Sequence, residues 1–168
     1  MIILVYNNIL VPYDGSQPSH LAVQHAFNFT KIDTLPVTTK KVHLLYVIQE
    51  IRVPPELYSY PLHELDKLTA KYIKQLYQDL DTKATNMLKA KSLEFKEGRE
   101  IAISTHVLLG DPADKIIEFA DSENIDLIIM GNVGLRGSTK IKTLGSVSRR
   151  VSEMARCPVL LVHQMNLS

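Results

Sequence analysis

Near the start of the chain, an apolar strand runs directly into a cluster of turn-forming residues, Ile9-Leu10-Val11-Pro12-Tyr13-Asp14-Gly15-Ser16. Ser16 is a suitable N-cap for a following helix, and Pro18 is tolerated in a first helical turn. The helix should end near Lys31. Its expected buried face consists of residues spaced three or four apart, namely Ala22, His25, Ala26 and Phe29. The segment is therefore predicted to be a strand–turn–helix unit.

The same alternation continues to the end of the chain. Further strands are expected at residues 42–48, 101–107, 126–130 and 158–163. The proline-rich stretch 49–62 is expected to be a loop. A long amphipathic helix should run from Leu65 to Met87, and its pattern leaves room for a break near Asp81. Two later helices are indicated, one with a capped start at Asp111-Pro112-Ala113-Asp114 and one that contains Val147, Val151 and Met154.

Five strands that alternate with four helices predict an α/β fold. Each strand–helix–strand connection makes the two strands parallel and gives a right-handed crossover. The predicted architecture is a doubly wound open sheet of five parallel strands with helices on both faces. Ligands of such sheets bind beyond the carboxyl ends of the strands, where the strand order reverses. A binding site is therefore expected in the loops after the first and fourth strands.

The composition limits the class of protein. The chain has 168 residues, of which 45% are hydrophobic, so a single domain over residues 1–168 can bury a sizeable core. A formal charge of +1 gives no overall field that would attract nucleic acid or an anionic membrane. The single cysteine, Cys157, excludes a disulfide scaffold and a cysteine-ligated metal site. The opening MIILVY is too short to span a membrane and lacks the features of a signal peptide, which favours a cytoplasmic protein.

The loop after the fourth strand combines features that favour phosphate. Its glycines let backbone N–H groups approach an anion, and Gly145-Ser146 stands at or near a helix start, where free N–H groups and the helix dipole favour negative charge. Between Gly131 and Arg156, Glu153 is the only acidic residue. The basic residues of that stretch are Arg136, Lys140, Lys142, Arg149, Arg150 and Arg156. A flexible glycine loop beside a solvated basic helix face would explain the same pattern without a ligand.

This loop resembles that of the universal stress protein family. The family's nucleotide loop follows G-x2-G-x9-G-[S/T], and here the spacing is one residue longer, G-x2-G-x10-G-S, at Gly131, Gly134, Gly145 and Ser146. Residues 10–16, LVPYDGS, are similar to the family's opening V-P-x-D-x-S, and residues 156–162, RCPVLLV, to its last strand. The resemblance covers most of the chain and is weakest before Asn8 and at 49–62.

The resemblance implies an ATP-binding protein with the strand order 3-2-1-4-5. In ATP-binding members, the aspartate after the first strand and a residue at the end of the second hold the adenosine, and the glycine loop holds the phosphates. Carried over, the binding residues are Pro12, Asp14, Val47, Met130, Gly131, Gly134, Gly145, Ser146 and Val147. The Asp14 carboxylate can accept hydrogen bonds from a ribose, and the apolar Val47 and Met130 can flank a base. A turn-capping role is the alternative for Asp14.

No catalytic constellation is visible in the sequence. It has no Walker lysine pattern, no G-x-S-x-G elbow and no H-E-x-x-H helix. Its six histidines show no recurrent metal-ligand spacing, so any Mg²⁺ would accompany the phosphates of ATP, or of ADP or AMP.

The predicted function is that of a nucleotide-dependent sensor or regulator in a stress response. A slow ATPase and a nucleotide-free scaffold are the alternatives. The apolar last strand lies at the sheet edge in the family's topology, which indicates a homodimer that pairs these C-terminal edge strands.

Overall fold

The computed structural model describes residues 6–30, 40–50, 65–96, 101–134 and 144–163. The strands are β1 (Asn8–Pro12), β2 (Lys41–Ile48), β3 (Ala102–Leu109), β4 (Leu127–Gly131) and β5 (Val159–Val162). The helices are α1 (Gln17–Thr30), α2 (Leu65–Lys96), α3 (Pro112–Ser122) and α4 (Ser146–Met154). The predicted alternation of strands and helices is confirmed, whereas most of the predicted loop at 49–62 lies outside the described residues.

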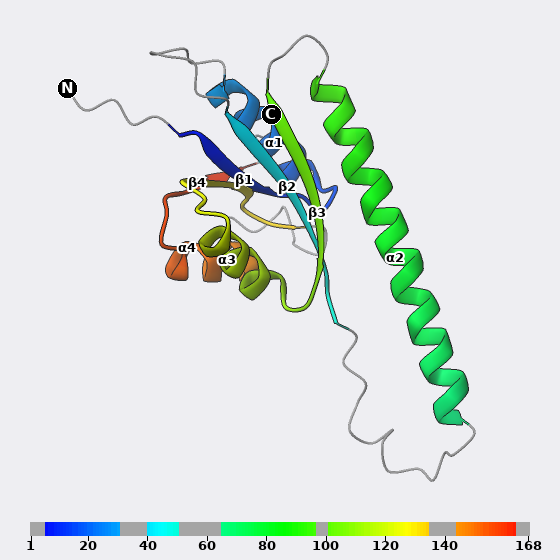
Figure 1. The fold of residues 1–168 in the computed structure, drawn as a ribbon. Coiled ribbons are helices and arrows are strands. Elements are labelled where there is room, and N and C mark those ends of the chain that lie inside the picture. The colour runs from blue at the N-terminus through cyan, green and yellow to red at the C-terminus, as the bar shows by residue number, and fades with distance from the viewer. Residues whose placement is uncertain (1–5, 31–39, 51–64, 97–100, 135–143, 164–168) are drawn as a thin grey trace, which may run out of the picture.

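Five parallel strands form one sheet in the order β3-β2-β1-β4-β5 (Figure 1). This is the predicted doubly wound topology. The strand order reverses between β1 and β4, because β2 and β3 lie on one side of β1 and β4 and β5 on the other. Ile9 of β1 pairs with Val42 of β2 and with Leu127 of β4, so these three parallel strands are aligned at the same level of the sheet. Their carboxyl ends therefore reach one edge beside the switch point.

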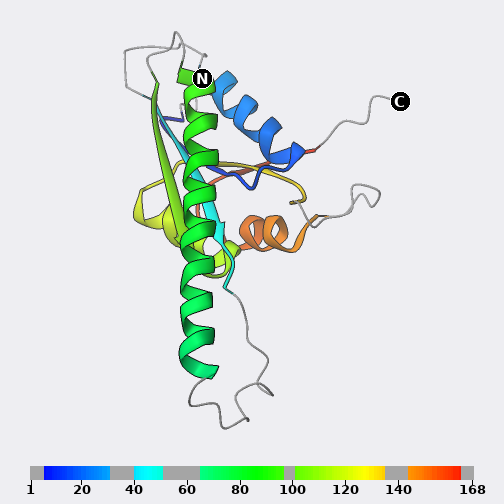
Figure 2. The same cartoon turned by 90° about the vertical axis from the view of Figure 1, so that its right-hand side faces the viewer.

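Each face of the sheet has its own apolar core, because successive side chains of a strand point to opposite faces. Ile9 and Val11 belong to the core beneath α1 and α2, and Leu10 belongs to the core beneath α3 and α4 (Figures 1 and 2). All three side chains are fully buried. β1 is thus the central strand of the sheet and is covered on both faces, so it holds the turn that follows it in place.

The buried face of α1 differs from the prediction at one position. Ala22 and Ala26 are buried and Phe29 packs against the core, as expected, but His25 is exposed and Phe27 is buried. The Phe27 ring stacks on Phe95 of α2, with 4.2 Å between the ring centroids. The aromatic partner on a distant helix therefore helps to determine which side of α1 faces the core.

The two predicted helix caps are confirmed. Ser16 Oγ accepts a hydrogen bond from Ser19 N at 3.3 Å. Asp111 Oδ1 accepts from the backbone N–H groups of Ala113 and Asp114, each at 3.1 Å. Such caps satisfy N–H groups that have no partner within the first turn of a helix.

α2 is one continuous helix, without the break near Asp81 that the sequence allowed. Its C-terminal half packs on the sheet through Ala84 and Leu88, which are 3% and 0% exposed. Its N-terminal half runs past the carboxyl ends of β2 and β3 (Figures 1 and 2), and Tyr72 in that half is 73% exposed. The helix is therefore anchored along only part of its length.

Candidate functional site

The turn after β1 places Asp14 beside the switch point. Pro12 ends β1, and Tyr13 N donates to Leu45 O of β2 at 2.8 Å, which fixes the turn to the sheet. Asp14 Oδ1 accepts a hydrogen bond from Ser16 N at 2.9 Å, as in an Asx-turn. The turn-capping role considered for Asp14 is therefore present, and it engages Oδ1.

The described residues at the end of β4 and just after it, up to Gly134, lie against this turn. A Cβ atom added at Gly134 would lie 2.7 Å from Asp14 Oδ2, closer than a Cβ atom can normally approach. Gly131 is equally confined, because a Cβ atom there would lie 2.7 Å from Pro18 Cβ and 3.1 Å from Ser19 N at the start of α1. Glycine at both positions thus allows the loop to lie directly on the β1 turn and α1.

The start of α4 is tied to the same loop. Gly145, the N-cap residue of α4, donates its N–H to Asn132 O at 2.8 Å. The buried Ser148 Oγ lies 2.6 Å from Asn132 O and 3.0 Å from Gly145 O. No side chain among the described residues caps the first turn of α4. The N–H groups and the dipole at this helix start can therefore interact with an anion.

The apolar members of the predicted site share one face of the sheet. Val47, Met130 and Val147 all pack on the core beneath α3 and α4. Met130 is buried, whereas Val47 and Val147 are half-buried. Ser146 is the first residue of α4 and is exposed. The predicted residues therefore come from the carboxyl ends of three neighbouring strands and from one helix start.

Two of the basic residues near the loop are engaged elsewhere, which corrects the charge argument from the sequence. Arg150 Nη2 lies 2.6 Å from Asp114 Oδ1, and its Nη1 lies 3.4 Å from Asp111 Oδ1. Arg156 Nη1 lies 3.7 Å from Asp121 Oδ2. Both arginines pair with carboxylates at the two ends of α3, so the positive field at the loop is weaker than the residue count indicates. Three of the six basic residues, Arg136, Lys140 and Lys142, lie outside the described residues.

A buried tyrosine supports the turn that carries Asp14. Tyr13 is 3% exposed, and its Oη lies 2.9 Å from His20 Nδ1 on α1. Burial raises the pKa of Tyr13 to about 12 and lowers the pKa of His20. Both groups are therefore neutral near pH 7, and the hydrogen bond between them joins two uncharged side chains. The pair holds the turn in place rather than exchanging a proton.

The sequence as a whole matches one known family. The sequence profile of the universal stress protein family matches residues 5–163. The chain belongs to the universal stress protein family. Universal stress protein MJ0531 of Methanocaldococcus jannaschii is 34% identical to it over 94% of this chain and 82% of the relative.

Solved structures of universal stress proteins share the fold. A structure of protein MJ0577 of Methanocaldococcus jannaschii has a TM-score of 0.76 to this chain at 26% identity, and covers 97% of this chain and 99% of its own. A family protein of Arabidopsis thaliana with AMP bound has a TM-score of 0.60 at 18% identity, over 94% of this chain and 91% of its own, a likeness of fold alone.

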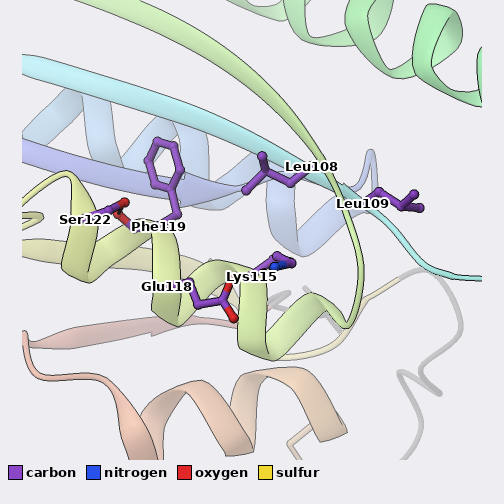
Figure 3. Close-up of a pocket in the computed structure, with 6 residues that line it drawn as sticks. All are labelled: Leu108, Leu109, Lys115, Glu118, Phe119 and Ser122. Carbon is purple, nitrogen blue, oxygen red and sulfur yellow. Dashed lines mark hydrogen bonds and ion pairs between the residues drawn. The ribbon is translucent and has the colours of Figure 1, made fainter.

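Two surface hollows of this universal stress protein are lined by residues other than the predicted nucleotide residues. One, of about 430 Å³, lies between the end of β3 and α3 and is lined by Leu108, Leu109, Lys115, Glu118, Phe119 and Ser122 (Figure 3). Lys115 Nζ and Glu118 Oε2 form an ion pair at 2.6 Å on its α3 side. The other, of about 780 Å³, lies between α2 and the ends of β2 and β3. Neither is lined by any residue carried over from the family.

Sequence reasoning missed the contacts that assemble the site. The contact of Gly134 with Asp14 joins residues far apart in the chain, and the hydrogen bond from Ser148 to Asn132 spans 16 positions. No local pattern marks such pairs.

Among the described residues, no group of three or more His, Cys, Asp or Glu side chains is placed to hold a metal ion. No helix within the described ranges is long and apolar enough to cross a membrane.

Proposed function

We propose that this universal stress protein binds ATP, or the related ADP or AMP, at the carboxyl ends of β1 and β4, and acts as a nucleotide-dependent sensor or regulator. The observation that carries the proposal is the close approach of Gly134 to Asp14, next to an α4 start that no described side chain caps. This contact supports a site at the switch point that combines a carboxylate with a helix start whose N–H groups favour an anion.

Each part of an adenine nucleotide has a matching group there. The N–H groups at the start of α4 suit phosphate, and the exposed Ser146 hydroxyl is a further donor. The Asp14 carboxylate suits ribose hydroxyls, and Val47 and Met130 suit the apolar faces of a base. Mg²⁺ would be held chiefly by the phosphates. The relative that holds AMP adds support from the family.

Thermal melting with and without nucleotide tests the proposal. Nucleotide-stripped protein is heated with Mg²⁺ alone, with Mg²⁺-ATP and with Mg²⁺-GTP. A ligand at about a hundred times its Kd stabilises the native state by about 2.7 kcal/mol. For a domain of this size, that corresponds to an increase in Tm of a few degrees. An increase with ATP and none with GTP is expected. No increase with ATP would overturn the proposal and leave the scaffold function as the better account.

We also propose that two copies pair through β5. This strand is at the sheet edge, and its Leu160 and Leu161 are only half-buried within one chain. An apolar edge strand invites pairing with another strand. Light scattering should show a dimer at micromolar concentration, and a monomer would refute this arrangement.

We also propose a cytoplasmic location, because a reducing compartment suits the free thiol of Cys157.

A further inference from the structure

Three polar side chains meet on the sheet beneath α3, away from the nucleotide residues. His43 of β2 pairs in register with Ser104 of β3, and His106 follows two residues later on the same strand face. His43 Nδ1 lies 3.2 Å from His106 Nε2 and 2.9 Å from Ser104 Oγ, and His106 Nε2 lies 3.0 Å from Ser104 Oγ. Three atoms that can bind a cation therefore form a nearly equilateral triangle.

The orientation of the His43 ring is fixed by Asn8. Asn8 Nδ2 donates to the carbonyl oxygens of Glu123 and Asn124 at 2.7 and 3.2 Å, which assigns Asn8 Oδ1 as an acceptor. Asn8 Oδ1 lies 2.7 Å from His43 Nε2, so that nitrogen carries the proton. In the neutral ring, the lone pair is then on His43 Nδ1, which faces the triangle. Histidines that bind metal ions commonly donate their second N–H in this way.

The dimensions of the triangle match a coordination face. In an octahedral complex with bonds of about 2.1 Å, neighbouring ligand atoms are about 3.0 Å apart. We propose that His43 Nδ1, His106 Nε2 and Ser104 Oγ form one face of a binding site for Ni²⁺, a first-row transition-metal ion that favours imidazole. His106 binds the ion as the tautomer with its proton on Nδ1. Solvent water completes the coordination.

The surroundings hold both imidazoles in position. His43 is 7% exposed, and Phe119 of α3 packs on both rings, with ring centroids 5.6 Å from His43 and 4.7 Å from His106. Burial is the main cause that lowers the pKa of each histidine, while Glu123 favours positive charge at both. Ser104 and His106 are half-exposed on the edge strand β3, which gives an ion access.

Calorimetric titration of untagged protein with Ni²⁺ tests the site. We expect one ion per chain. The Kd for Ni²⁺ should rise by about 10- to 100-fold in His106→Asn. Asn8→Ala should also raise this Kd, because the His43 ring loses the partner that orients it. His25→Asn is the matched control, because His25 is exposed on α1. It should bind Ni²⁺ as the natural chain does. Circular dichroism melting checks that each variant is folded.

A second measurement needs no variant. Paramagnetic Ni²⁺ added in small amounts should broaden the ring NMR signals of His43 and His106 before those of His20, His25 and His163. Broadening centred on another histidine, unchanged Ni²⁺ affinity in folded His106→Asn, or the absence of binding heat would each overturn the proposal. Because the titrations contain no nucleotide, their result is independent of the proposed nucleotide site.

Discussion

Gly134 and Asp14 lie in direct contact across the switch point, so close that a Cβ atom on residue 134 would be 2.7 Å from Asp14 Oδ2. The contact joins the loop after β4 to the turn after β1. Asp14 also accepts a hydrogen bond from Ser16 N, so its carboxylate is held from the α1 side as well. The position of this carboxylate therefore depends on both loops of the proposed nucleotide site.

Alanine at the two loop glycines should have different effects. In Gly134→Ala, the side chain of Asp14 must move, so we expect weaker Mg²⁺-ATP binding with little change in Tm. In Gly131→Ala, the new methyl group meets Pro18 and the backbone of Ser19. Overpacking of that kind costs about 1–3 kcal/mol, which should lower Tm. Calorimetric titration and thermal melting of both variants measure the difference, and equal loss of Tm in the two would contradict this account.

Substitution of Asp14 separates binding from chemistry. If Asp14 holds the ribose, Asp14→Ala should raise the Kd for Mg²⁺-ATP by about 10-fold, which corresponds to about 1.4 kcal/mol. Any slow hydrolysis at saturating ATP should then be nearly unchanged. Asp14→Asn is the control for the turn, because its amide oxygen can still accept from Ser16 N. A collapse of saturated turnover in Asp14→Ala would instead indicate that the carboxylate acts in hydrolysis.

Loss of the Ser148 hydroxyl should loosen the start of α4. Ser148→Ala removes the buried hydrogen bond to Asn132 O, at an expected cost of about 1 kcal/mol in the free energy of unfolding. Nucleotide affinity should fall as well, because the hydrogen bond that joins Asn132 to the first turn of α4 is lost. Ser152→Ala is the matched control, since Ser152 Oγ donates to Ser148 O within the exposed part of the same helix. Denaturant unfolding and ATP titration compare the two, and indistinguishable results would count against the bracing role.

The stability of the fold should depend on Tyr13 at high pH. The pKa of Tyr13 is raised from 10.0 in the unfolded chain to about 12 in the folded one. Its contribution to stability is therefore complete below pH 10 and is lost as the pH rises from 10 to 12. Tyr13→Phe cannot ionise, so the natural chain should lose stability relative to this variant across that range. Melting curves of both proteins at each pH show the difference, and a constant difference in Tm would be inconsistent with the raised pKa.

Much of the fold was predictable because it depends on local patterns. The apolar runs that form β2 and β4 and the cap at Asp111 are each visible within a few residues. The buried face of α1 was predicted wrongly only at His25, because periodicity alone did not single out Phe27 without the partner ring of Phe95. α2 continues through Asp81 without the break that the sequence allowed, and Asp81 is exposed there.

The chemistry of the candidate site was less predictable, because it depends on contacts between distant segments. The sequence shows that Arg150 is basic, but its pairing with Asp111 and Asp114 requires α3 and α4 to lie side by side. In the same way, the pairing of His43 with His106 follows from the register of β2 and β3 rather than from histidine spacing along the chain. Sheet topology determines these partners.

The partial anchoring of α2 has a consequence for local unfolding. Around Ala84 and Leu88 the helix shares its burial with the sheet, so its amide hydrogens there should exchange with solvent only when the core opens. Around Tyr72 the backbone hydrogen bonds have little packing to protect them, and an isolated helix of that length is marginal in water. Hydrogen exchange should therefore be fast around Tyr72 in the N-terminal half of α2 and slow around Leu88 in its C-terminal half. The two halves of this single helix then belong to two different cooperative unfolding units.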